Sequence, residues 1–214
     1  MKNIKKAVPI IVVIFLNVIF LSSCKKDSSP GAGSGPETYP TPIANIAPQS
    51  MIDSLKARGA NIYSGTTPPI VNGVYLMTPD SCTYDNSPGN TAGAIYADYK
   101  FRFSAQDNSS YTITVEQKIL PAGTLSAAPV STYISGNGNN FSIFTLRNQS
   151  ANGISGQIFN VFSGTLTATG IKKLQNILYI RSKGSDPNNL LAPAGTIRVF
   201  INGGQGTAIN SATF

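Results

Sequence analysis

The chain has 214 residues, with 16 basic and 9 acidic side chains, two cysteines and no histidine. The absence of histidine removes the commonest general base and the commonest ligand of transition metals. The sequence therefore argues against zinc enzymes and against catalysis by a Ser-His-Asp or Cys-His arrangement. The nine carboxylates show no recognisable paired spacing, so we expect no metal and no cofactor.

The first 23 residues have the layout of a secretory signal. Lys2, Lys5 and Lys6 precede an apolar segment from residue 7 to 20, and small residues follow it. That segment, of about 14 residues, is shorter than the roughly 20 residues that cross a bilayer as a helix. We expect residues 1–23 to be removed, which leaves 13 basic residues against 9 acidic ones, a formal net charge of +4. The remaining charges are scattered and form no basic stripe, so no nucleic-acid partner is expected.

The signal ends in Leu21-Ser22-Ser23-Cys24. This box resembles the recognition motif of bacterial lipoproteins, in which lipid is attached to the cysteine sulfur and the chain is cut before that residue. The resemblance implies that Cys24 carries acyl chains that anchor the protein in a membrane, and several chains make such an anchor effectively permanent. In that family an Asp after the cysteine favours the inner membrane, and Lys25 stands there instead. The resemblance thus implies an outer-membrane lipoprotein, periplasmic or surface-exposed; the alternative is a plain secretory peptide with an incidental cysteine.

Residues 24–47 are rich in Gly, Ser and Pro and poor in apolar side chains, which predicts a disordered tether. After them, Met51, Ile52 and Leu55 follow helical spacing and Gly59 is placed to end a helix. We expect one short amphipathic helix whose apolar stripe covers the core. The predicted organisation is a signal at 1–23, a lipidated tether at 24–47, and a single β-domain with a short leading helix at 48–214.

Beyond this helix the apolar period changes to two. Tyr99, Phe101 and Phe103 alternate with Lys100 and Arg102, which is typical of a half-buried strand. Similar patterns predict about eight strands, at 72–78, 99–103, 111–116, 129–135, 140–147, 157–168, 174–182 and 195–202. Short turns containing glycine join several of them and indicate an antiparallel meander. We expect a mainly β fold that closes as a barrel or forms a sandwich.

Two features of these strands are similar to the lipocalins. Gly73-Val74-Tyr75 begins the first predicted strand and Arg198 lies in the last, where lipocalins have a Gly-x-Trp start and a late Arg that stacks on the aromatic ring. The resemblance implies a calycin-like barrel, with Tyr75 and Arg198 as a barrel-closing pair and an interior pocket for a small apolar molecule. Tyr in place of Trp departs from that pattern, and an ordinary turn with a surface arginine is the alternative.

The segment before the second predicted strand contains Cys82 and four oxygen-bearing side chains, Asp80, Asp85, Asn86 and Asn90. Once Cys24 carries lipid, Cys82 has no cysteine partner, and we expect a small half-buried residue there. The four oxygen side chains lack the alternating spacing of a calcium loop. A turn-rich loop is therefore expected here.

Three classes of function remain open. The first is a lipid-anchored cell-envelope binding module for a small apolar molecule or a saccharide. The second is a structural or interaction subunit that docks on an outer-membrane complex, so that its partner is an envelope protein. The third is a hydrolase whose paired carboxylates are assembled by folding. Because no catalytic spacing is visible, we expect the protein to bind rather than to catalyse, so that it is not an enzyme.

Overall fold

The computed structural model describes residues 37–89, 92–203 and 206–214. The predicted signal and most of the predicted tether, including Leu21, Ser22, Ser23 and Cys24, lie outside the described residues. Within the described ranges no helix has the length and apolar character that crossing a membrane requires.

The prediction of a mainly β fold is confirmed, and the structure contains one sheet of 12 strands. The pairings in the sheet are antiparallel apart from the parallel pair β1–β7. The strands are β1 (Thr66–Thr67), β2 (Gly73–Met77), β3 (Asp80–Asp85), β4 (Ile95–Tyr96), β5 (Tyr99–Asp107), β6 (Thr112–Ile119), β7 (Thr124–Asn137), β8 (Asn140–Ala151), β9 (Ile154–Thr167), β10 (Gly170–Lys183), β11 (Ile197–Asn202) and β12 (Thr207–Asn210).

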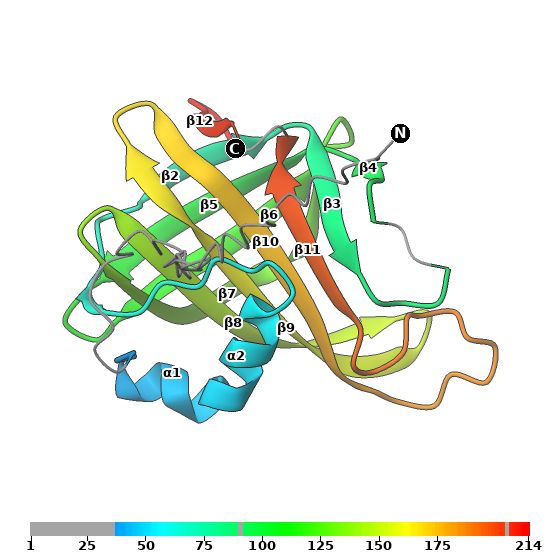
Figure 1. Cartoon of the computed structure of the whole chain (residues 1–214). Helices are drawn as coiled ribbons and strands as arrows, with labels where there is room; N and C mark the ends of the chain where they lie inside the picture. Colours follow the sequence, from blue (N-terminus) through cyan, green and yellow to red (C-terminus); the bar gives the residue numbers. More distant parts are fainter. Residues whose placement is uncertain (1–36, 90–91, 204–205) are drawn as a thin grey trace, which may run out of the picture. The chain divides into compact units, whose positions relative to one another are not determined.

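Eight strands form a closed ring in the order β10-β12-β2-β5-β6-β7-β8-β9, which returns to β10 (Figure 1). One edge of β10 pairs with β9, so β12 and β11 must share the other edge. β12 pairs with Gly170–Lys172 of β10, and β11 pairs with Gln175–Tyr179 of β10. β11 therefore lies outside the ring, and so do β3 and β4, which follow β11 in the strand order of the sheet. All eight predicted strands exist, but the ring is closed by the unpredicted β12 rather than by β11.

The ring closes through a close backbone approach at Gly170. A Cβ atom built on Gly170 would lie 2.1 Å from the carbonyl oxygen of Ala208 in β12. The φ angle of Gly170 is +149°, in the region that favours glycine. A glycine is thus needed where β10 and β12 meet.

Apolar side chains fill much of the inner face of the ring. Phe101, Phe103, Phe141 and Phe162 are 0–1% exposed. Their ring centroids lie 5.2–6.3 Å apart in the tilted and edge-on pairs of this cluster, an arrangement that aromatic side chains favour. Cys82 belongs to the same cluster and is 1% exposed, so it is more deeply buried than predicted. Packed side chains therefore occupy this part of the interior, where the lipocalin resemblance implied a pocket for an apolar ligand.

The helices α1 (Thr41–Ile46) and α2 (Gln49–Lys56) pack on the outer face of the sheet, where Figure 1 shows them in blue beside β8 and β9. α2 is the predicted helix. α1 lies in the predicted tether, so that prediction is wrong for its last residues. Ile43 is fully buried against Phe144 and other residues of a second apolar cluster. The structured domain therefore begins before residue 41.

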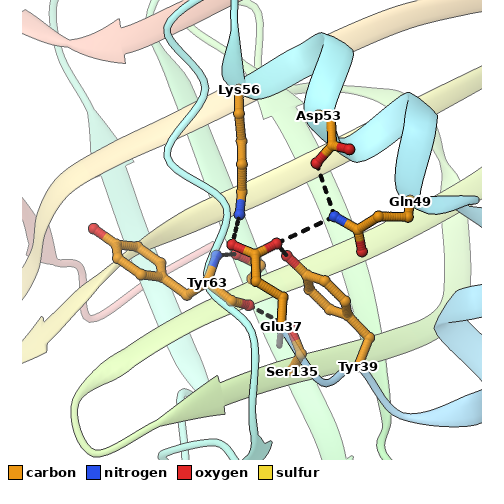
Figure 2. Close-up of polar contacts among 8 residues, drawn as sticks. Glu37, Tyr39, Gln49, Asp53, Lys56, Tyr63 and Ser135 are labelled. Atoms are coloured by element: carbon orange, nitrogen blue, oxygen red, sulfur yellow. Dashed lines mark hydrogen bonds and ion pairs between the residues drawn. The ribbon is translucent and has the colours of Figure 1, made fainter. Parts of the chain in front are cut away.

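A polar network ties the chain before α1 to α2 (Figure 2). The Glu37 carboxylate accepts hydrogen bonds from Lys56 Nζ, from Gln49 Nε2 at 3.2 Å and from the Tyr39 hydroxyl at 3.2 Å. The bond from Lys56 lowers the pKa of Glu37, whereas burial raises the pKa of Tyr39. The Tyr39 ring meets Phe144 of β8 edge-on, with centroids 5.9 Å apart. The first described residues are thus fixed to both the helix and the sheet.

Replacing Ile43 with alanine should destabilise the domain by about 2–4 kcal/mol, because the change leaves a cavity between α1 and the sheet. The measurement is urea unfolding followed by circular dichroism. Ile70→Ala is the matched control, since Ile70 is 58% exposed and its truncation should change little. Equal stability of the Ile43 variant and the parent would mean that α1 does not belong to the folded domain.

Candidate functional site

A pocket of about 390 Å³ lies on the inner face of the sheet, beside the part of β10 that pairs with β11. Its volume falls within the range of about 300–1,000 Å³ that small-molecule sites have. β3, β4, β5, β6, β8, β9, β10 and β11 all contribute to its lining. The pocket thus occupies the region where the branch formed by β11, β3 and β4 diverges from the ring. Figure 1 shows this branch of the sheet.

Register places the polar lining on the same face as the phenylalanine cluster. Asn176 of β10 lies opposite both Phe162 of β9 and Phe200 of β11. Residues directly opposite each other in an antiparallel pair share a face of the sheet. Asn160, two residues before Phe162, also points to that face. The inner face therefore changes from apolar to polar along β9 and β10.

Arg147 of β8 brings a charge into the pocket. Its Nε atom is buried and has no hydrogen-bond partner, and no ion pair of Arg147 occurs among the described residues. Burial lowers the pKa of this guanidinium. Arg147 is half-buried, and a charge taken partly out of water without a partner is costly, so Arg147 is a candidate to bind an anionic or hydrogen-bond-accepting group.

Asp80, at the start of β3, is 3% exposed and its Oδ1 atom has no hydrogen-bond partner. Burial, together with the charge of the nearby Asp98 carboxylate, raises the pKa of this carboxyl to about 7. At neutral pH the Asp80 carboxyl is therefore present in both forms. It can accept a hydrogen bond when ionised and donate one when protonated.

Amide and phenol groups complete the polar wall. Asn160 is 1% exposed and donates from Nδ2 to Asn176 Oδ1 at 3.2 Å, while its own Oδ1 has no partner. Burial and the charge of Asp80 raise the pKa of Tyr99, and the charge of Arg147 opposes this shift. The Tyr99 hydroxyl is thus influenced by both charged groups of the pocket.

Arg198 also lines the pocket, but its charge is compensated. Its Nε atom lies 2.9 Å from Asp85 Oδ2, and its Nη2 atom donates to Ser87 Oγ at 3.4 Å. The Asp85 side chain is fully buried and also accepts a hydrogen bond from the backbone N–H of Ser87 at 2.7 Å. Arg147 is consequently the arginine of this pocket that lacks an ion-pair partner in the described chain.

The structure does not join Tyr75 and Arg198, the barrel-closing pair implied by the lipocalin resemblance. In the described part of the chain, the Tyr75 hydroxyl donates to the Val71 carbonyl at 3.1 Å and its ring packs beside Phe103. Arg198 contacts Asp85 instead. The reason is topological, because β2 belongs to the ring whereas β11 lies outside it.

The segment with the four oxygen side chains is a strand over Asp80–Asp85, so the predicted turn-rich loop is wrong there. Asp85 is engaged with Arg198, and Asn86 Oδ1 accepts the backbone N–H of Ile197 at 2.6 Å. Asn90 lies outside the described residues. Across the described ranges, no three His, Cys, Asp or Glu side chains form a group suited to a metal ion.

Sequence reasoning missed the polar residues of the pocket, although part of the signal was present. The alternation of period two along their strands places Arg147, Asn160 and Asn176 on the same face as the inward-pointing apolar residues. A polar residue at such a position predicts either a buried hydrogen bond or a binding site. Asp80 gave no comparable signal, because β3 itself was not predicted.

The Asp80→Asn variant should change how stability depends on pH. The pKa of Asp80 is about 7 in the folded protein against an ordinary value of 3.8, so the parent loses stability as pH rises from about 4 to about 7 and no further above that. The variant lacks this loss and should be more stable than the parent by roughly 1–4 kcal/mol at pH 8, because one pKa unit corresponds to about 1.4 kcal/mol.

Urea unfolding of both proteins at pH 4 and pH 8 measures this difference, which should be small at pH 4. Asp186→Asn is a control of opposite sign, since hydrogen bonds lower the pKa of Asp186 to about 2 and its replacement should destabilise the protein at pH 8. A parent and an Asp80 variant that differ equally at both pH values would contradict the burial of an ionisable carboxyl in the pocket.

Comparisons of the chain with protein-family models, with curated proteins and with solved structures find no match.

Proposed function

We propose that the protein is a binding module of the cell envelope, held there by acyl chains on Cys24, and that its pocket takes a small hydroxylated ligand with an acidic group, such as a sugar acid. The observation that carries the proposal is the set of buried polar atoms without partners in one pocket. These atoms are Arg147 Nε, Asp80 Oδ1 and Asn160 Oδ1.

Each group predicts a feature of the ligand. A guanidinium binds carboxylate groups through charge-assisted hydrogen bonds, so Arg147 favours an acidic ligand. Asp80 Oδ1 and Asn160 Oδ1 are acceptors and favour ligand hydroxyl groups. Leaving a buried polar group without a partner costs about 1–3 kcal/mol. A ligand that supplies all the missing partners would remove this cost.

Of the ligand classes expected from the sequence, the polar one fits the structure better. Phe101, Phe103, Phe141 and Phe162 already fill one apolar part of the interior. The remaining pocket has amide, carboxyl and guanidinium groups beside an aromatic wall, in which Tyr96 meets Phe200 edge-on with centroids 5.3 Å apart. Such a wall suits the carbon skeleton of a sugar ring.

Binding rather than turnover is the function that we propose. Hydrolysis of a glycosidic bond by the common mechanisms needs two carboxyl groups in one site. Among the described residues that line the pocket, Asp80 supplies the carboxyl group. Asp98 acts on Asp80 through its charge, but it is not a lining residue and accepts a hydrogen bond from the Thr78 hydroxyl at 2.8 Å.

Glucuronic acid should bind the purified protein more tightly than glucose, and Arg147→Gln should weaken glucuronic acid about 10- to 100-fold, the range expected for loss of a hydrogen bond to a charged group. Isothermal titration calorimetry measures both affinities. Arg181→Gln is the matched control, because Arg181 is exposed on the same sheet but does not line this pocket. The proposal is wrong if neither sugar binds, or if both variants bind glucuronic acid as the parent does.

Cys24→Ser should abolish lipid attachment and move the protein from the membrane fraction to the soluble fraction of cells, because the acyl chains are the proposed anchor. The folded domain should keep its circular dichroism spectrum. Mass spectrometry of the mature parent should find an acylated Cys24 at the amino terminus. An unmodified terminus at any other residue would end the proposal of a lipid anchor.

A further inference from the structure

A second pocket, of about 180 Å³, has a different character from the first. Its large aliphatic side chains are those of Ile154, Ile158, Leu178, Ile180 and Leu191. The first four come from β9 and β10, and Leu191 comes from the loop that joins β10 to β11. Gln149 of β8 and Arg198 of β11 also line this apolar compartment.

The apolar compartment adjoins the polar pocket. Gln149, Ile158, Leu178 and Arg198 line both of them. Ile158 lies opposite Ile180, and Leu178 lies opposite both Asn160 and Arg198, so these side chains share the inner face. Along β9 that face therefore runs from Asn160 to Ile158 and then to Ile154, from polar to apolar.

The loop that covers the apolar compartment is held by Asp186. The Asp186 carboxylate accepts hydrogen bonds from the backbone N–H groups of Leu190 and Leu191, both at 2.9 Å, and from Lys183 Nζ at 2.9 Å. Lys183 Nζ also donates to the carbonyl of Leu191 at 3.1 Å. Leu191 is thus fixed over the compartment before any ligand arrives, and such preorganisation lowers the entropic cost of binding.

We propose that the ligand is amphipathic, with its acidic, hydroxylated head in the polar pocket and a short apolar substituent in the compartment beneath Leu191. The inference rests on the proposed function and adds the chemical class of the ligand. Arg198 lies at the junction, where Asp85 compensates its charge and its aliphatic stem can lie along the substituent. A purely polar ligand would leave the apolar compartment unused.

The test compares glucuronic acid with methyl and butyl glucuronides by calorimetry. Burial of one methylene contributes about 0.8 kcal/mol, so each methylene that enters the compartment should tighten binding about fourfold. Leu191→Ala should reduce the advantage of the butyl over the methyl compound and leave the affinity for glucuronic acid unchanged. Leu190→Ala is the matched control, because the neighbouring Leu190 is 56% exposed and does not line the compartment.

The outcomes separate this inference from the function on which it rests. If glucuronic acid binds but the butyl compound binds no better than the methyl compound, the amphipathic ligand is wrong and the polar binding site stands. Equal effects of the two leucine variants on butyl glucuronide would also overturn the inference. If none of the three compounds binds, the proposed function fails as well.

Discussion

The architecture depends on how the long strand β10 divides one of its edges between two partners. β9 pairs along the whole of one edge, so the other edge must serve both β12 and β11. The first three residues of β10 pair with β12 and close the ring, with Gly170 in close approach to β12. From Gln175 onward the same edge carries β11, which leads out of the ring to β3 and β4. This branching creates the inner surface on which the pocket lies.

One part of the interior stabilises the fold, and another part forms the proposed binding site. Four phenylalanine side chains with almost no exposure fill one apolar part of the interior, and burial of side chains of that size is a main source of folding free energy. Where the branch begins, Arg147, Asp80 and Asn160 instead each bury a polar atom that has no partner. Each of these groups reduces stability. Their presence in one pocket is therefore better explained by a ligand than by the requirements of the fold.

The packing of the helices on the outer face of the sheet adds stability beyond that of the inner face. α1 and α2 cover an independent apolar cluster that includes Phe144 and Phe159 on the outward face of β8 and β9. These strands thus carry buried apolar side chains on both faces, such as Phe141 and Phe144 of β8. The support from outside lets the inward positions of the same strands, such as Asn160, carry polar groups.

The sequence allowed prediction of the elements whose alternation is long enough to be recognised. Tyr99, Phe101 and Phe103 reveal β5 because three apolar residues share one face. β12 has only four residues and β4 only two, too few to establish a period, and so closure by β12 was not predictable. Local alternation also does not say which strands share an edge. The meeting of Asp80 with Arg147 in one pocket depends on that long-range pairing, so the candidate site required the structure.

The central claim is that the branch point of the sheet forms a binding site, and the most direct measurement is a nuclear magnetic resonance titration with glucuronic acid. Amide chemical-shift changes should concentrate on the pocket-lining parts of β3, β8, β9, β10 and β11 and saturate with increasing ligand. Changes confined to the helical face around α1 and α2, or the absence of any saturable change, would contradict the account.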